Sequence, residues 1–320
     1  MKKRPSISWP AREPCPVCGT DAFSLGPLPP LAAVGGAEWE SAGFQAGQLF
    51  SCPTCTLCFR APTRASGDYL RLYESLGTTE LWTFEGERPL WRHVRRLLER
   101  APSRSVLDVG CFRGDFLSWL GEGWDRFAVE PSIAGRAEVR RRGIQVVGST
   151  LDALPETGLS YGSITMIDVI EHLPRPLDAL EELVGCLQPG GLLVLFTGST
   201  DSLGWRLSPR HYWYAALPEH VCFFRPSWFA WAAPRLGCEV EDVQRHAYRV
   251  AGLGPRLSEA VRSIAYLSYR RLEDELGPGA RLQRVPIVSR LGRWPTAWWT
   301  SARDHVLVAL RRAAGSRTDV

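Results

Sequence analysis

Residues 103–196 alternate short apolar runs with amphipathic segments of helical spacing. Strands that alternate with helices in this way build a parallel sheet, because each helix carries the chain back across the face of the sheet. The apolar runs predict strands at residues 105–109, 127–130, 144–147, 163–167 and 192–196. We therefore expect an α/β fold whose ligands lie at the carboxyl ends of the parallel strands.

A glycine-containing turn follows the first predicted strand. Asp108 precedes the turn, Gly110 permits a tight bend, and Gly114 lets the next helix pack closely on the strand. Cys111 lies in the same turn as a small loop residue. Glu130 ends the second strand about 20 residues later, where a carboxylate accepts hydrogen bonds from ribose hydroxyls. This pattern predicts a site for a nucleotide cofactor.

Two more loops are expected at the same edge of the sheet. Leu151 and Asp152 lie in the loop after the third strand, and Asp168 follows the fourth strand. Carboxyl ends of neighbouring parallel strands meet at one edge, so these residues are expected to face the same ligand.

Four segments in this order, VLDVGCFRGDFLSWL, AVEPS, ITMIDVIEHLPRPLDAL and LQPGGLLVLFT, closely resemble class I S-adenosylmethionine-dependent methyltransferases. The ubiquinone-biosynthesis O-methyltransferase-like branch is the nearest type, and the resemblance covers about residues 100–250. It implies a Rossmann-like seven-stranded methyltransferase sheet with one reversed strand, and S-adenosylmethionine as cofactor. The resemblance implies that Asp108, Gly110 and Gly114 form the turn that holds the cofactor. It also implies that Glu130 binds the ribose, that Leu151 and Asp152 lie beside the adenine, and that Asp168 borders the methionine end.

Two positions depart from the family pattern. Phe112 replaces the usual second glycine of the turn, a substitution that the turn tolerates if the side chain points away. Tyr161-Gly162 stands where the family commonly has an aromatic residue followed by aspartate, which removes a supporting carboxylate.

The amino-terminal region has two Cys-x-x-Cys pairs, Cys15/Cys18 and Cys52/Cys55. Each pair can aim two thiolates at one point, and two such pairs complete a closed, structural tetrahedral zinc site. Cys58 is surplus to this site. Disulfides are less expected, because no signal peptide precedes the cysteines. The module also resembles the one that precedes the methyltransferase domain in some deoxysugar C-methyltransferases.

A hydroxyl or carbon acceptor requires a base that removes its proton. His220, with Glu219 beside it, is the first candidate, since the segment resembles the Glu-His-aromatic motif of sugar methyltransferases; the alternative is a structural histidine that holds the loop. His172 is the second candidate. In ubiquinone-type relatives an array like Asp168, Glu171 and His172 binds a divalent cation, here magnesium or manganese; the alternative is that Glu171-His172 caps a helix and lines the pocket.

The chain divides into a zinc-binding ribbon at 1–62, a helical linker at 63–102, the cofactor domain at 103–254 and a basic helical extension at 255–320. The extension holds twelve Arg against six acidic residues, with helices predicted at 255–276 and 298–313. Arg and Trp there suit peripheral contact with an anionic membrane surface; the alternative is a C-terminal helical extension packed over the substrate side.

The net charge of +4 is too small to imply a polyanionic partner, and few cations lie near the ribbon, which argues against nucleic acid. With neither a spanning segment nor a signal peptide evident in this sequence, a cytoplasmic location is expected. The expected function is O- or C-methylation of a small hydroxylated or sugar-like acceptor, free or carrier-linked. The alternatives are an rRNA or tRNA methyltransferase that docks through the ribbon, or a non-enzymatic zinc-dependent interaction protein. The oligomeric state is not predicted.

Overall fold

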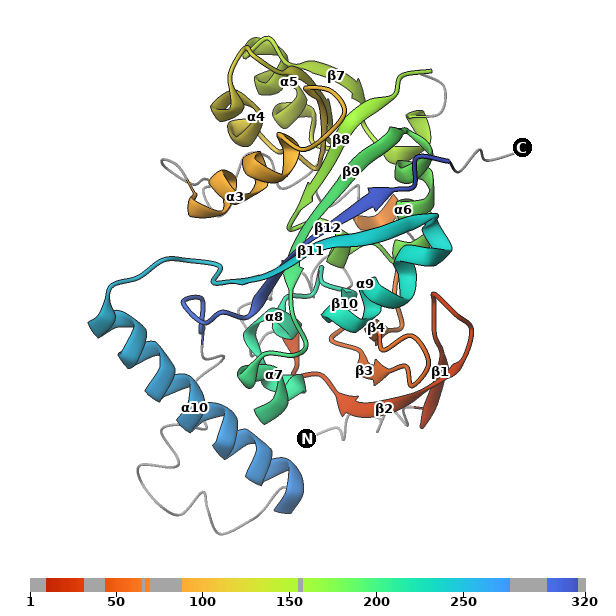
Figure 1. Ribbon diagram of the computed structural model, residues 1–320. Helices are drawn as coiled ribbons and strands as arrows, with labels where there is room; N and C mark the ends of the chain where they lie inside the picture. Colours follow the sequence, from red (N-terminus) through yellow and green to blue (C-terminus); the bar gives the residue numbers. More distant parts are fainter. Residues whose placement is uncertain are drawn as a thin grey trace.

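The computed structural model describes residues 10–31, 44–64, 67–69, 88–154, 158–276 and 298–315. Its main sheet has seven strands, and a smaller sheet of five strands contains the amino-terminal residues (Figure 1). The main strands are β5 (Ser105–Val109), β6 (Asp125–Val129), β7 (Gln145–Gly148), β8 (Tyr161–Ile167), β9 (Leu187–Gly198), β11 (Cys238–His246) and β12 (His305–Arg312). Their order across the sheet is β11-β12-β9-β8-β5-β6-β7.

The centre of the main sheet is parallel, as the sequence predicts. β5 pairs in parallel with β6 and β8, β6 with β7, and β8 with β9. The five predicted strands are confirmed with shifted boundaries, the largest shift being in β9, which begins at Leu187 instead of 192. One reversed strand, β12, pairs antiparallel with both β9 and β11, so the expected seven-stranded methyltransferase sheet with one reversed strand is confirmed.

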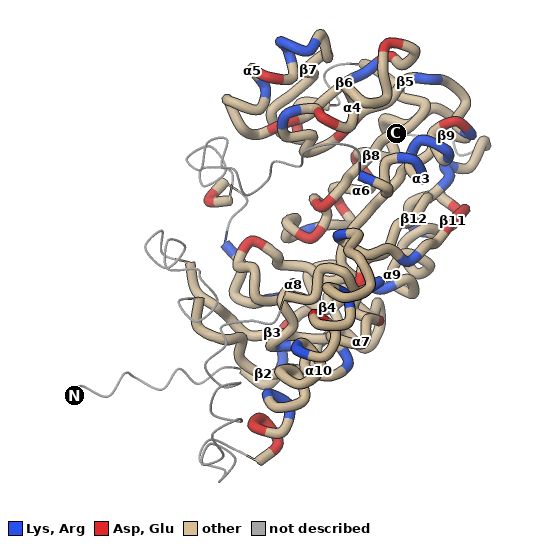
Figure 2. The backbone as a smooth tube through the Cα atoms, turned by 90° about the vertical axis from the view of Figure 1, so that its left-hand side faces the viewer, with Lys and Arg blue, Asp and Glu red and all other residues tan. Residues whose placement is uncertain are grey.

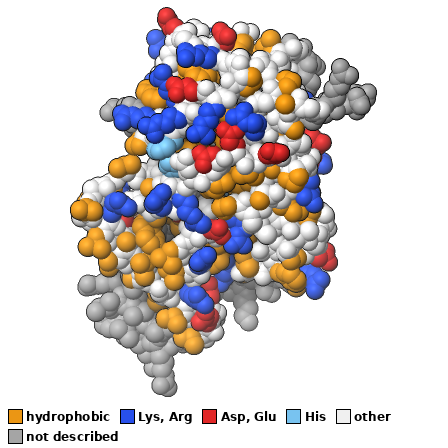
Figure 3. Space-filling view, in the orientation of Figure 1, with side chains coloured by type: hydrophobic (Ala, Val, Ile, Leu, Met, Phe, Trp, Pro, Cys, Tyr) orange, Lys and Arg blue, Asp and Glu red, His pale blue; other side chains and the backbone are white. Residues whose placement is uncertain are grey.

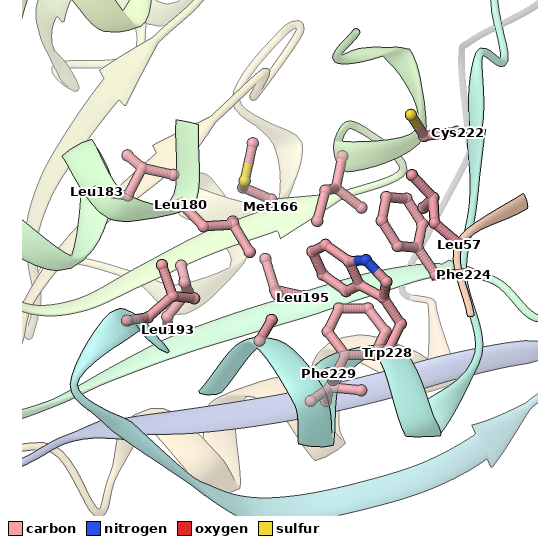
Figure 4. Packing of buried hydrophobic residues seen from close by; sticks show 14 of the residues in the cluster. Leu57, Met166, Leu180, Leu183, Leu193, Leu195, Cys222, Phe224, Trp228 and Phe229 are labelled. Atoms are coloured by element: carbon pink, nitrogen blue, oxygen red, sulfur yellow. The ribbon is translucent and has the colours of Figure 1, made fainter. Parts of the chain in front are cut away.

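Helices cover both faces of this sheet. On one face pack α3 (Pro89–Leu98), α4 (Asp115–Leu120) and α5 (Ile133–Arg141), and on the other α6 (Pro176–Gly185) and α9 (Pro226–Ala232). Alternate residues of the strands enter the two cores, because successive side chains point to opposite faces: Val194 lies in one core, and Leu193 and Leu195 in the other. Figure 4 shows this second core, where Leu180 and Trp228 lie near the strand residues.

The helix predicted at 298–313 is wrong, because residues 305–312 form strand β12 in the main sheet. The run HVLVALRR is almost entirely buried. A strand buried on both faces has a continuous apolar sequence, and periodicity alone does not distinguish such a run from a buried helix. The other predicted helix of the extension is confirmed as α10 (Leu253–Leu276). The region predicted as a helical extension therefore also supplies a strand between β9 and β11.

The smaller sheet is an antiparallel ribbon of four amino-terminal strands, to which a fifth strand from a later part of the chain is added. Its strands are β1 (Arg12–Pro14), β2 (Asp21–Pro27), β3 (Gln48–Ser51), β4 (Cys58–Ala61) and β10 (Cys222–Phe223), in that order across the sheet. β10 pairs with β4 although it follows the cofactor loops in sequence. Leu57 belongs to the same core cluster as Trp228. The ribbon and the cofactor domain thus share a sheet and a core (Figure 4).

The long helix α10 extends from the body of the molecule (Figure 1). Its exposed residues include several apolar ones: Leu253, Leu257, Val261, Ile264, Leu272 and Leu276. Among the described residues, no helix combines the length and the apolar character that crossing a membrane requires. Peripheral membrane contact through residues 255–320 stays a prediction. In Figure 2 the strands β2 to β4 are mostly tan, which shows how few charged residues the ribbon carries.

Candidate active site

A cavity of about 410 Å³ lies at the carboxyl ends of β5, β6, β7 and β8, where the sequence predicts ligand contacts. The loops that follow these four strands all contribute to its lining. The predicted site residues that line it are Asp108, Gly110, Cys111, Glu130, Leu151, Asp152, Asp168 and His172. Gly114, Glu219 and His220 are not among the lining residues. The sheet topology thus brings most of the predicted site into one cavity.

The turn after β5 has the backbone that its glycines suggest. Gly110 has φ +70°, and a Cβ there would lie 2.6 Å from Cγ2 of Val169. Gly114 has φ +73° and begins α4, where a Cβ would lie 3.0 Å from Cδ1 of Ile144. Gly114 therefore permits close packing, as expected, rather than lining the cavity. Phe112 also has a positive φ, +51°, which a non-glycine residue adopts with strain.

Glu130 is buried at the end of β6 and receives two backbone hydrogen bonds. The N–H of Phe112 donates to Oε2 at 2.7 Å, and the N–H of Ser132 donates to Oε1 at 2.8 Å. Burial raises the pKa of Glu130 to about 7, against these hydrogen bonds. A carboxylate offers about four acceptor positions, so both oxygens retain capacity for the hydroxyls of a ribose. These features fit the predicted contact with the cofactor ribose.

Asp168 lies in the loop after β8 with φ +57°. Its Oδ2 faces Nη1 of Arg88 at 3.4 Å. Its Oδ1 is buried in the cavity wall and has no hydrogen-bond partner among the described residues. An unpaired buried acceptor fits the donor that an amino-acid ammonium group provides, which is the group at the methionine end of S-adenosylmethionine. On the other side of the turn, Asp108 accepts a hydrogen bond from Thr165 at 2.6 Å, and burial raises its pKa to about 7.

The lining residues that were not predicted from the sequence include Arg88, Trp91 and Tyr248, which lie outside the loops that follow the parallel strands. The Arg88 guanidinium lies 5.2 Å from the ring centroid of Tyr248, a cation–π distance. Arg88 and Trp91 come from the segment predicted as a helical linker, and Tyr248 follows β11. The one local signal near Arg88 and Trp91 is the proline that follows Arg88, and it predicts the start of a helix but not a ligand contact.

The two histidines predicted as candidate bases lie together, with His172 nearer the cavity. Their ring centroids are 4.9 Å apart in an edge arrangement. Nδ1 of His172 lies 3.2 Å from the carbonyl oxygen of Glu219, and Nδ1 of His220 lies 2.9 Å from that of Tyr214. Burial lowers the pKa of His172, and burial together with His172 lowers the pKa of His220 well below its usual value. Both imidazoles are therefore neutral at neutral pH.

The cation ligands predicted from the sequence do not all come together. Ligand atoms of Glu171, His172 and His220 lie within 4.8 Å of one another, whereas Asp168 is not part of this group. Asp168 turns instead toward Arg88. Glu171 is fully buried, and both its oxygens accept hydrogen bonds, from Thr197 at 2.9 Å and from the hydroxyl of Tyr214. The combination of Asp168 with Glu171 and His172 stays a prediction, and the residues whose ligand atoms converge are Glu171, His172 and His220.

The four cysteines predicted as metal ligands form one cluster in the ribbon. Cys15 and Cys55 have their sulfurs 3.6 Å apart, Cys18 and Cys52 3.4 Å apart, and all four sulfurs lie within 4.8 Å of one another. The N–H of Cys55 also points to the sulfur of Cys52, at 3.5 Å. Cys58 is buried on β4 outside the cluster. Four thiols that converge in this way can bind a metal such as zinc, which prefers four ligands in a tetrahedral arrangement.

This sheet, with its cavity at the carboxyl ends of the parallel strands, is that of a class I S-adenosylmethionine-dependent methyltransferase. The family described as a methyltransferase domain matches residues 84–243, half of the chain, and the protein belongs to that family. It is therefore an S-adenosylmethionine-dependent methyltransferase. This membership excludes the non-enzymatic interpretation.

Two curated relatives are similar over part of the chain. A tRNA U34 carboxymethyltransferase of Methylococcus capsulatus is 26% identical over 198 residues, 59% of this chain and 59% of that protein. A ubiquinone biosynthesis O-methyltransferase of Xanthomonas axonopodis pv. citri is 29% identical over 191 residues, 55% of this chain and 79% of that enzyme. A solved S-adenosylmethionine-dependent methyltransferase of Archaeoglobus fulgidus is 17% identical with a TM-score of 0.46, over 76% of this chain and 99% of that one.

Proposed function

We propose that this enzyme methylates an oxygen or carbon atom of a small hydroxylated or sugar-like metabolite, in the biosynthesis of a glycan or secondary metabolite. The observation that carries the proposal is that one cavity contains the cofactor residues Glu130 and Asp168 together with the neutral imidazole of His172. The cavity is deep enough to bury Glu130 while its lining combines apolar and acidic side chains, which suits a small molecule rather than a flat macromolecular surface.

The chain's own residues provide binding, orientation and proton removal. S-adenosylmethionine, when bound, supplies an electrophilic methyl group. Glu130 would hold the ribose and Asp168 the ammonium group, which fixes the direction from which the acceptor must approach. The tautomer of His172 that donates from Nδ1 to the carbonyl of Glu219 keeps its lone pair on Nε2, where it can take the acceptor's proton. His220 as base stays a prediction; its position behind His172 also suits a role in orienting that ring.

The cysteine cluster has a structural role in this proposal. Cys15, Cys18, Cys52 and Cys55 would hold zinc in a closed site that leaves no position for substrate. The metal would hold the ribbon in place. Strand β4 of the ribbon pairs with β10, which directly follows the loop that contains Glu219 and His220, so the metal site would also help to position that loop. A divalent cation at Glu171, His172 and His220 has no part in this proposal, in which Glu171 accepts hydrogen bonds from Thr197 and Tyr214.

A second candidate is methylation of RNA, which the similarity to tRNA U34 carboxymethyltransferases favours. The ribbon argues against it as a docking surface. Its described residues carry only two arginines, Arg12 and Arg60, of which Arg60 is buried, against two acids. Binding to RNA depends on neutralising several phosphates and weakens steeply with salt.

Radiolabelled methyl transfer distinguishes the two candidates. Zinc-loaded protein is incubated with methyl-labelled S-adenosylmethionine and, in parallel, with nucleotide sugars, other hydroxylated metabolites and RNA. Glu130→Gln serves as a folded variant with a weakened cofactor site. We expect label in a small hydroxylated acceptor, and much less with the variant. Label in RNA alone would refute the small-molecule proposal.

A further inference from the structure

A second cavity, of about 290 Å³, lies beside the cofactor cavity and has a strongly basic lining. Four arginines and two histidines line it, and no acidic residue does: Arg245, Arg249, Arg256, Arg303, His93 and His246. They come from α3, the end of β11, the start of α10 and the segment before β12. The cavity therefore gathers positive charge from parts of the chain that are distant in sequence. Figure 3 shows basic side chains near histidine on this face.

Contacts hold several of these guanidinium groups in place. Arg303 donates from Nε and Nη2 to the backbone carbonyl oxygen of Arg245, at 3.2 Å and 2.8 Å. Arg249 donates from Nε to Thr300 at 3.3 Å and pairs with Glu259. For Arg256, no side-chain partner occurs within the described residues. A site that combines three guanidinium groups held by contacts with the unpaired one of Arg256 is arranged for the oxygens of phosphate.

His246 supplies a neutral hydrogen-bonding group in the same lining. Its Nε2 is buried and without a hydrogen-bond partner in the described part of the chain. Its ring stacks edge-on against His93 with centroids 4.9 Å apart. Burial, together with the nearby His93 and Arg303, lowers the pKa of His246 to about 4. An uncharged imidazole beside arginines can donate to an anion oxygen.

The two cavities share a wall. Tyr248 lines the cofactor cavity, whereas Ala247 and Arg249 on either side of it line the basic cavity. In α3, Trp91 lines the first and His93 the second. A molecule that passes the edge of Tyr248 would thus place one part near His172 and another among the arginines. The basic cavity is thus a neighbour of the cofactor cavity across residues 247–249.

We propose that the basic cavity binds the phosphate or diphosphate group of a small acceptor whose methylated part lies in the cofactor cavity. The identity of the acceptor rests on the proposed function, whereas anion binding does not. A small ligand fits better than an RNA backbone, because carboxylates flank the cluster: Asp201 pairs with Arg245, and Glu259 pairs with Arg249. These acids would repel a continuous line of phosphates but leave a single compact anion in contact with the arginines.

Calorimetric titration of the zinc-loaded full chain with inorganic pyrophosphate tests the anion site. We expect one saturable site, weakened about tenfold or more by Arg256→Gln, since a charge-assisted contact is lost. Arg140→Gln is the matched control, because Arg140 is an exposed arginine on α5 outside both cavities, and its affinity for pyrophosphate should match wild type. Thermal unfolding of both variants checks that they are folded.

Three results would overturn the proposal: no saturable binding of pyrophosphate, binding that Arg256→Gln does not weaken, or RNA binding that Arg256→Gln weakens and pyrophosphate does not displace. A parallel titration with S-adenosylmethionine separates the two claims, since a protein that binds pyrophosphate but not the cofactor keeps the anion site and refutes the proposed function. With a nucleotide sugar as acceptor, Arg256→Gln should raise KM and leave kcat nearly unchanged; an equal fall in kcat would contradict a binding role.

Discussion

Arg60 of the ribbon donates from Nε to the backbone carbonyl oxygen of His220 at 3.1 Å, across 160 residues of sequence. The same guanidinium also donates to the carbonyls of Ala46, Ala215 and Leu217, at 2.6, 2.7 and 2.9 Å. Its side chain is buried, and burial lowers its pKa to about 10, so it stays charged at neutral pH. One side chain thus connects the metal-binding ribbon to the loop that positions the candidate bases.

Arg60→Met should lower the free energy of unfolding by about 3 kcal/mol or more, because four backbone carbonyl oxygens lose their donor, two of them in buried hydrogen bonds. Urea denaturation of the zinc-loaded protein measures this loss. Arg64→Met, an arginine of the same region with a partly exposed side chain, is the control and should change stability little. A loss below about 1 kcal/mol in Arg60→Met would show that water or other donors replace the guanidinium.

Cys15→Ser should abolish metal binding, whereas Cys58→Ser should retain it, because Cys58 lies outside the cluster of four thiols. Metal content per chain, measured by mass spectrometry, distinguishes them. Since β4 pairs with β10, loss of metal from Cys15→Ser should also lower methyl transfer while S-adenosylmethionine still binds. Equal metal content in both variants would contradict the assignment of the ligands.

Burial of Asp108 and Glu130 should make the stability of the cofactor-free protein fall as the pH rises from about 4.5 to about 7. Asp108 and Glu130 have folded-state pKa values raised to about 7 by burial, so the folded state binds protons more tightly than the unfolded state until the pH passes that value. The buried histidines His172 and His220, whose pKa values burial lowers, act in the opposite direction, because their unfolded forms bind protons more readily. This contribution is common to wild type and Glu130→Gln, so comparing the two isolates the effect of Glu130. Urea titrations at several pH values should show that the free energy of unfolding falls less with rising pH in Glu130→Gln than in wild type. A free energy of unfolding that depends on pH as steeply as in wild type would exclude Glu130 as a source of the pH dependence.

Substitution of the two histidines should separate proton removal from cofactor binding. His172→Ala should bind S-adenosylmethionine normally and lose turnover by about 100-fold or more, as expected for a general base. His220→Ala should also retain the cofactor and lose turnover. His211→Ala, whose ring contacts Ser208 outside the cavity, is the control. Unchanged turnover in either variant, measured by labelled methyl transfer, would eliminate that residue from catalysis.

Much of the cofactor site is predictable because its signals are local. Gly110 and Glu130 each follow a strand, and parallel topology alone then brings them to one edge of the sheet. The signal for the metal site is equally local, since each Cys-x-x-Cys pair is four residues long. By contrast, β12 and β10 join sheets whose other strands lie far away in sequence, and their short apolar runs carry no mark of their partners.

The division of roles among the histidines was not predictable for the same reason. The sequence places His172 and His220 in similar Glu-His pairs. Contacts between segments distant in sequence draw His220 behind His172. They include the hydrogen bond from Arg60 to the carbonyl of His220, the hydrogen bond from the N–H of Val221 to the carbonyl of Glu171, and the pairing of β10 with β4. Arg88 and Tyr248 were missed because the facing of a side chain depends on how α3 and the segment after β11 pack against the sheet.

The central claim is that the cavity after β5 binds S-adenosylmethionine, and calorimetry on Gly110→Ala tests it most directly. Gly143→Ala is the matched control, because Gly143 has φ +69° but a Cβ there meets open space, whereas at Gly110 it meets Val169 in the cavity wall. We predict one cofactor per chain in wild type and in Gly143→Ala, and affinity reduced by at least about tenfold in Gly110→Ala. No binding to the zinc-loaded wild type, or equal affinity in both variants, would contradict the assignment.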